Sequence, residues 1–118
     1  MKFFNILTLA SIMLMFNIMS LAAEEFHIPL ESNIIFSLNE NPSTGYRWEW
    51  IITNNSTSSK IEIVDMGYFS SSNRPGAGGV HRWKIHAIKK GVTSVNWQYR
   101  RPWIPKPIDR KLVEFVIP

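Results

Sequence analysis

Short runs of alternating side chains, separated by turn-forming residues, constrain this chain more than any other feature. In the clearest run, Tyr46–Thr53, the side chains of Tyr46, Trp48, Trp50 and Ile52 point one way and their neighbours point the other. A period of two is typical of a β-strand with one buried face. No segment shows the apolar stripe with capping residues that an amphipathic helix requires.

The other predicted strands are bounded by residues that favour turns. They are Glu25–Pro29, Ile34–Leu38, Lys60–Phe69, Val80–Ile88, Val92–Tyr99 and Asp109–Ile117. About seven to eight short strands in about 95 residues predict an all-β, immunoglobulin-like β-sandwich. The chain has no cysteine, so the sandwich has no disulfide and must be held by the packing of its aromatic and aliphatic residues.

Residues 1–22 are expected to be a secretory signal peptide. Lys2 is their only charge, Phe3–Leu21 is almost wholly apolar, and the stretch ending at Ala22 offers the small residues that signal peptidase reads. Cleavage would leave one domain, residues 23–118, beginning at Ala23 or Glu24. The alternative is an N-terminal membrane anchor, because the apolar run approaches spanning length. A mature protein that still begins with Met1 would favour that anchor.

This segment predicts a protein that is secreted or lies in the lumen of lysosome-like vesicles, or in the periplasm of a bacterium. After cleavage we expect no membrane association. Asn54 and Asn55 both begin N-x-[ST] sequons, so either could carry a glycan in a eukaryotic secretory pathway. A plain solvated loop is the favoured reading of these residues, because such triplets arise easily where Asn and Ser are frequent.

Composition disfavours several functions. The net charge is +4 and there is no long basic run, so no nucleic-acid partner is expected. His27, His81 and His86 lie on predicted strands without the spacing of metal ligands, and the carboxylates are scattered. No enzyme, metal site or cofactor is therefore predicted. The glycine-rich stretch Gly76–Gly79 precedes a strand and not a helix, unlike a phosphate-binding loop.

A stiff turn links the second and third predicted strands. Its proline fixes one φ and pushes the preceding asparagine toward extended geometry. Its glycine permits positive φ, and its amide and hydroxyl side chains can bond nearby backbone groups. The residues of this turn are Asn41, Pro42, Ser43, Thr44, Gly45 and Tyr46.

Two later loops are equally distinctive, one glycine-rich and one rich in proline. Three prolines rule out a central strand in the second of them. In an immunoglobulin-like sandwich these three loops lie at one end, where restricted loops on a rigid scaffold indicate a binding surface. The residues of interest in the two later loops are Arg74, Gly76, Ala77, Gly78, Gly79, Arg101, Pro102 and Trp103.

Together, the segments N-P-S-T-G-Y, G-A-G-G and R-P-W-x-P resemble the three signature loops of the chagasin-type inhibitors of cysteine proteases. Their order, spacing and flanking strands agree over essentially the whole chain after residue 22. The family pattern usually has Thr where this chain has Ser43, a change that keeps the hydroxyl.

The resemblance implies a reversible, competitive inhibitor of papain-like (clan CA, cathepsin-type) cysteine proteases, either host or endogenous. It implies that Asn41–Tyr46 enters the active-site cleft over the catalytic centre, while Gly76–Gly79 and Arg101–Trp103 clasp either side. We expect the inhibitor to be a monomer.

Trp103, held between prolines, is predicted to be a preorganised aromatic anchor, with a core position as the alternative. Arg74, Arg100 and Arg101 either form a basic rim that suits acidic cleft margins or are merely solvated charges. The alternative function is an exported carbohydrate-binding or adhesion module, because exposed aromatic side chains on sandwiches often stack on sugars.

Overall fold

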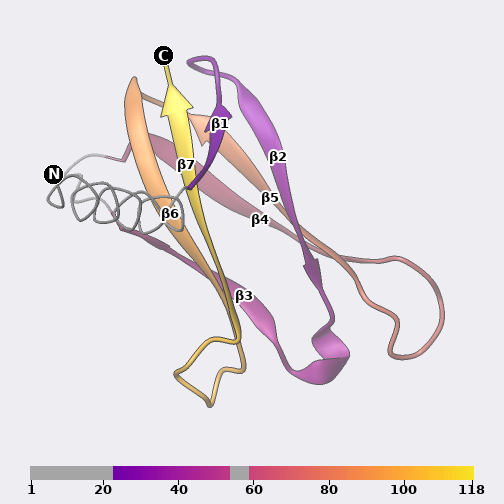
Figure 1. The fold of residues 1–118 in the computed structure, drawn as a ribbon. Helices are drawn as coiled ribbons and strands as arrows, with labels where there is room; N and C mark the ends of the chain where they lie inside the picture. The colour runs from indigo at the N-terminus through magenta and orange to yellow at the C-terminus, as the bar shows by residue number, and fades with distance from the viewer. Residues whose placement is uncertain (1–22, 54–58) are drawn as a thin grey trace, which may run out of the picture.

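The computed structural model describes residues 23–53 and 59–118. The predicted signal peptide and the sequons at Asn54 and Asn55 lie outside the described residues. Within them the chain forms a two-layer β-sandwich (Figure 1). Its strands are β1 (Glu24–His27), β2 (Asn33–Glu40), β3 (Arg47–Ile52), β4 (Ile61–Ser70), β5 (Gly79–Ala87), β6 (Gly91–Arg100) and β7 (Asp109–Ile117), with a 3₁₀ turn η1 (Pro42–Thr44) between β2 and β3.

One sheet has the strand order β1-β7-β6-β3 and the other the order β2-β5-β4. The pairs are antiparallel except for β1, which runs parallel to β7. β1 ends before Pro29, which has no N–H to donate to a ladder. Each strand begins and ends within two residues of a predicted run. The arrangement confirms the predicted all-β, immunoglobulin-like sandwich.

The core is built on aromatic side chains from both sheets. The ring centroid of Phe36 lies 4.9 to 6.3 Å from the ring centroids of four other aromatic residues, which are Phe26, Trp83, Trp97 and Phe115. Such aromatic pairs contribute about 0.5–1.5 kcal/mol each beyond the burial of their area, which suits a domain without disulfides. The buried core residues are Ile28, Phe36, Leu38, Trp48, Ile61, Trp83, Ile85, Ala87, Val95, Trp97, Val113, Phe115 and Ile117.

The prediction that one face of β3 is buried is only partly correct. Trp48 is 8% exposed, but Trp50 is 40% exposed and Ile52 is 37% exposed. β3 is the edge strand of its sheet and pairs only with β6. The inner side of an edge strand is incompletely covered by the opposite sheet, so alternation alone does not ensure burial there.

Candidate functional site

The three predicted loops leave the same end of the sandwich, because the strand registers bring their ends together (Figure 1). Glu40 at the end of β2 and Ser70 at the end of β4 both pair with Gly79 at the start of β5. In the other sheet, Arg47 at the start of β3 pairs with Arg100 at the end of β6. We name the connections the Asn41 loop (residues 41–46), the Gly76 loop (residues 71–78) and the Trp103 loop (residues 101–108).

The Asn41 loop is closed by its own hydrogen bonds. The side-chain oxygen of Asn41 accepts from the backbone N–H of Ser43 at 3.2 Å and from its hydroxyl at 2.6 Å, as an N-cap does. The Thr44 hydroxyl donates to the Asn41 carbonyl at 2.6 Å. Gly45 ends η1 in the left-handed conformation at φ 83°, which glycine adopts at little cost. The loop therefore keeps its shape although no residue of η1 is buried.

Asn41 also ties this loop to its surroundings. Its backbone N–H donates to the Tyr99 hydroxyl at 3.1 Å, and its side-chain amide donates to the Gly76 carbonyl at 3.0 Å. The Tyr99 ring in turn stacks on Tyr46 and on Trp48, with centroids 5.4 and 4.7 Å apart. The Asn41 loop is thus attached to β6 on one side and to the Gly76 loop on the other.

Arg101 attaches the Trp103 loop to the Asn41 loop. Its Nε donates to the Thr44 carbonyl at 3.2 Å. Its guanidinium carbon lies 4.6 Å from the Tyr46 ring centroid and 6.0 Å from that of Trp103. The three loops are therefore joined by direct contacts into one surface.

Trp103 lies outside the core, since 69% of its surface is exposed. The Ile104 N–H donates to the Arg101 carbonyl at 3.0 Å, which closes a turn around Pro102 and Trp103. A large aromatic side chain is thus held at the tip of a closed turn, in contact with solvent. This excludes the core position that the sequence left open.

The three predicted rim arginines differ in their surroundings. Arg100, at the end of β6, is held between β3 and the Trp103 loop: its Nε donates to Glu49 at 2.9 Å and its Nη1 to the carbonyls of Pro102 and Ile104 at 3.3 Å. Arg101 is engaged by the Asn41 loop, as described above. Within the described part of the chain, only Arg74 of the three has a guanidinium without a partner. The basic rim predicted from the sequence is therefore reduced to Arg74 and the outer face of Arg101.

The glycines of the second motif have different roles. Gly76 has φ 77°, the left-handed region, with open space around it. At Gly78 a Cβ would lie 3.6 Å from the Glu40 carbonyl oxygen, an ordinary contact. At Gly79, already part of β5, a Cβ would lie 2.1 Å from the Phe69 carbonyl oxygen. Gly79 is therefore required by the packing of β4 on β5, whereas Gly76 and Gly78 are open to a partner.

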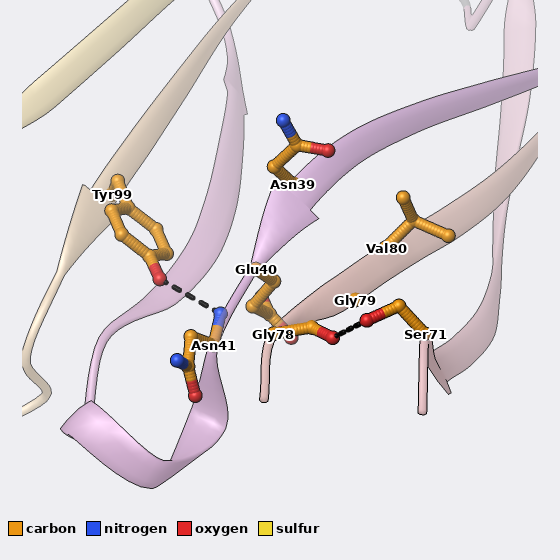
Figure 2. A pocket seen from close by; sticks show the side chains of 8 residues that line it. All are labelled: Asn39, Glu40, Asn41, Ser71, Gly78, Gly79, Val80 and Tyr99. Atoms are coloured by element: carbon orange, nitrogen blue, oxygen red, sulfur yellow. Dashed lines mark hydrogen bonds between the residues drawn. The ribbon is translucent and has the colours of Figure 1, made fainter. Parts of the chain in front are cut away.

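A shallow hollow separates the Asn41 loop from the Gly76 loop (Figure 2). The Ser71 hydroxyl, at its margin, donates to the Gly78 carbonyl and closes the base of the Gly76 loop. The hollow gives this end of the sandwich a concave site beside the protruding Asn41 loop. It is lined by Asn39, Glu40, Asn41, Ser71, Gly78, Gly79, Val80 and Tyr99.

The sequence reasoning missed a carboxylate beneath the Asn41 loop. Glu40 is 5% exposed; one carboxylate oxygen accepts from the Trp48 N–H at 3.0 Å, and the other lies 2.9 Å from Nδ1 of His81. Nε2 of His81 lies 2.6 Å from Oδ1 of Asp65. Burial lowers the pKa of His81, but the hydrogen bonds and charges of Glu40 and Asp65 outweigh it and raise the pKa above 6.5.

The sequence carries a signal for this cluster. Glu40 has the same strand phase as the buried Phe36 and Leu38, and His81 has the same phase as Trp83. A charged or titratable residue on the buried face of a strand needs a partner. Two such residues on different strands indicate a pair, although only the register shows that β2 and β5 are neighbours.

Within residues 23–53 and 59–118, no group of three or more His, Cys, Asp or Glu side chains is placed to hold a metal ion. In the same ranges there is no helix of the length and apolarity that crossing a membrane requires.

The fold and the joined loops define an immunoglobulin-like binding domain whose recognition surface lies at one end. The chain belongs to the chagasin family, because the sequence profile described as "Chagasin family peptidase inhibitor I42" matches residues 24–117. This match confirms the resemblance seen in the three loop motifs. It also identifies the chain as a member of an inhibitor family and not as an enzyme.

Solved structures show the same fold. The cysteine protease inhibitor EhICP2 from Entamoeba histolytica is 22% identical with a TM-score of 0.59, covering 81% of this chain and 86% of its own. PbICP-C, solved in complex with falcipain-2, is 17% identical with a TM-score of 0.64, covering 82% of this chain and 90% of its own. Amebosin is 25% identical with a TM-score of 0.51, covering 80% and 88%. No curated protein sequence matches the chain.

Proposed function

We propose that the chain is a reversible, competitive inhibitor of papain-like cysteine proteases that acts as a monomer and fills the active-site cleft with three loops. The observation that carries the proposal is the joining of the three loops into one surface, with Trp103 exposed at its edge. Membership of a peptidase inhibitor family supports inhibition. The cysteine class is supported by the inhibitor EhICP2 and by the complex of PbICP-C with falcipain-2.

In this proposal the Asn41 loop enters the cleft over the catalytic centre, and the Gly76 and Trp103 loops contact either side. The loops are already closed by hydrogen bonds before binding. A preorganised loop loses little conformational entropy on binding, so more of the contact energy remains as affinity. Trp103 supplies the large aromatic contact that dominates many interfaces.

A titration of papain with the purified domain tests the proposal. We expect full inhibition at micromolar domain, with the apparent KM raised and kcat unchanged, as for a ligand that competes for the cleft. Trypsin, whose nucleophile is a serine, serves as the control and should keep its activity. Unchanged papain activity in the presence of domain shown to be folded by circular dichroism would contradict the proposal.

The carbohydrate-binding or adhesion module, the alternative from the sequence, receives no support from the family match. Retention of the domain on insoluble polysaccharide, together with no effect on papain, would restore it.

A further inference from the structure

We propose that His81 is a pH-dependent positioning residue for the inhibitory surface: its imidazolium ties Glu40, at the root of the Asn41 loop, to Asp65 on β4, so that the domain binds its protease more tightly in acid than at neutral pH. This inference rests on the proposed function. It concerns a residue outside the three loops, and it predicts how the affinity of the same site is regulated.

The geometry at His81 suits a ring that carries a proton on each nitrogen. Nδ1 lies 2.9 Å from a carboxylate oxygen of Glu40, and Nε2 lies 2.6 Å from one of Asp65. An ionised carboxylate only accepts hydrogen bonds, so both nitrogens must donate, and only the imidazolium does so. The ring also lies 9° from the plane of Trp83 at 4.2 Å, an arrangement that favours a cation over an aromatic face.

The two carboxylates respond differently to loss of the proton. The Glu40 side chain is 4% exposed, whereas that of Asp65 is 62% exposed. Neutral His81 can donate to only one of them, and an unpaired buried carboxylate is the costlier outcome. We therefore expect Glu40 to keep a neutral donor and Asp65 to lose its bond to His81, while its Oδ1 still accepts from the Gly67 N–H at 2.7 Å. The bond left on Glu40 is weaker, because charge-assisted hydrogen bonds are roughly twice as strong as neutral ones.

Glu40 transmits this change to the Asn41 loop. It is the last residue of β2 and directly precedes Asn41. Its second carboxylate oxygen accepts from the N–H of Trp48, the second residue of β3. The carboxylate therefore joins the two strands between which the loop is held. Weakening its bond to His81 loosens the position of both ends of the loop relative to β5.

The other charged groups around His81 leave a net preference for the cation. Arg47 and Glu49 of β3 and Tyr68 of β4 line the same hollow as His81. Arg47 opposes a positive charge there, while Glu49 is already paired with Arg100. On β5 itself, Arg82 lies over the Phe69 ring. On β2, the residue that pairs with His81 is the uncharged Leu38.

The burial of the ring lowers the pKa of His81, but the hydrogen bonds and charges of the two carboxylates in direct contact with it outweigh burial and raise the pKa. A raised folded-state pKa means that the stability contributed by protonation is fully present below the unfolded pKa of 6.5. This contribution is lost as the pH rises through the folded pKa. The tie between Glu40 and Asp65 is thus strongest in acid.

The test compares the parent domain with His81→Gln, which can donate to Glu40 but does not titrate. The inhibition constant for papain is measured at about pH 5.5 and at a pH at least one unit above the midpoint of the parent's His81 ring titration, followed by NMR, so that the ring changes its charge between the two values. The ratio of variant to parent constants at each pH cancels the titration of papain itself. We expect this ratio to be about fivefold higher at the lower pH, at the low end of ordinary couplings between sites. His86→Gln, on the same strand but bonded to Asn33, is the matched control and should give an equal ratio at both values.

Asp65→Asn provides a second variant, because its side chain is exposed and its loss should be tolerated in folding. It should lower the midpoint of the His81 ring titration, followed by NMR, from a parent value above 6.5. A parent midpoint at or below 6.5, or an equal His81→Gln ratio at both pH values while the parent still inhibits, would overturn this inference and leave the inhibitor function intact. No inhibition by the parent at either pH would instead overturn the proposed function, and this inference with it.

Discussion

Trp48 and Trp103 are the same residue type in two contrasting regions of the molecule. Trp48, in β3, is 8% exposed; its indole N–H donates to the Asn39 carbonyl at 2.7 Å and its ring stacks on Tyr99. Trp103, in a turn between β6 and β7, is 69% exposed. The first is held by the sandwich. The second is held by the turn that carries it, by its neighbour Arg101 and by the close approach of its indole to Gly45 of the Asn41 loop, where a Cβ would lie 3.1 Å from the ring.

The contrast shows how the domain separates stability from binding. In the strands, an aromatic side chain is buried by the opposite sheet and contributes to folding. In the loops, backbone and side-chain hydrogen bonds fix the conformation, so that a large side chain can stay exposed for a partner. Substitutions in the two regions should therefore change different measured quantities.

The largest expected effect is on stability, from Trp48→Ala. Truncating a buried tryptophan costs about 3–5 kcal/mol of the free energy of unfolding, out of the roughly 5–15 kcal/mol available to a domain. Chemical denaturation measures the loss. Trp50→Ala is the matched control, since Trp50 lies on the same strand but is 40% exposed, and it should lose less than half as much. Equal losses of unfolding free energy in the two variants would mean that the difference in exposure between Trp48 and Trp50 does not determine their contributions to stability.

The next effect is on binding, from Trp103→Ala. If Trp103 is an interface anchor, its truncation should weaken inhibition of papain by about 2 kcal/mol or more, roughly thirtyfold. The melting temperature should hardly change, because the side chain is outside the core. Trp50→Ala, which removes an exposed tryptophan of β3 that belongs to none of the three loops, should inhibit like the parent. A Trp103→Ala variant that melts early but still inhibits would reverse the assignment of the two regions.

Much of the fold could be predicted because the informative signals are local. The alternation in residues 79–87 and 109–117 places Trp83 and Phe115 inward wherever their strands lie in the sheets. Proline and glycine mark the loops in the same local way, and the Asn41 loop is held by bonds between residues close in sequence.

The features that could not be predicted from the sequence depend on which strands are neighbours in the two sheets. The exposure of Trp50 follows from the edge position of β3, and the need for glycine at position 79 follows from the Phe69 carbonyl across the ladder. The pair of Glu40 and His81 is 41 residues apart and meets only through the register of β2 and β5. Likewise, nothing in the R-P-W motif indicates that Arg100 turns inward while Arg101 reaches the Asn41 loop.

Arg101→Lys has the smallest expected effect and tests the contact between the Trp103 loop and the Asn41 loop. Lysine keeps the charge but lacks the planar guanidinium, so it loses the bond from Nε to the Thr44 carbonyl and the stacking on Tyr46. Each of these contacts is worth about 0.5–1.5 kcal/mol, and we expect about fivefold to tenfold weaker inhibition of papain with little change in melting temperature. Arg74→Lys, in the Gly76 loop, is the matched control and should have a smaller effect.

A double variant shows how Arg101 acts. If its role is to hold Trp103 in place, Arg101→Lys should cost little more once Trp103 is alanine, because the side chain that it positions is gone. The two losses in binding free energy would then sum to more than the loss of the double variant. Full additivity would mean that Arg101 contacts the protease independently of Trp103. The contact between the Asn41 loop and the Trp103 loop would then contribute to the fold of the loops but not to the placement of the anchor.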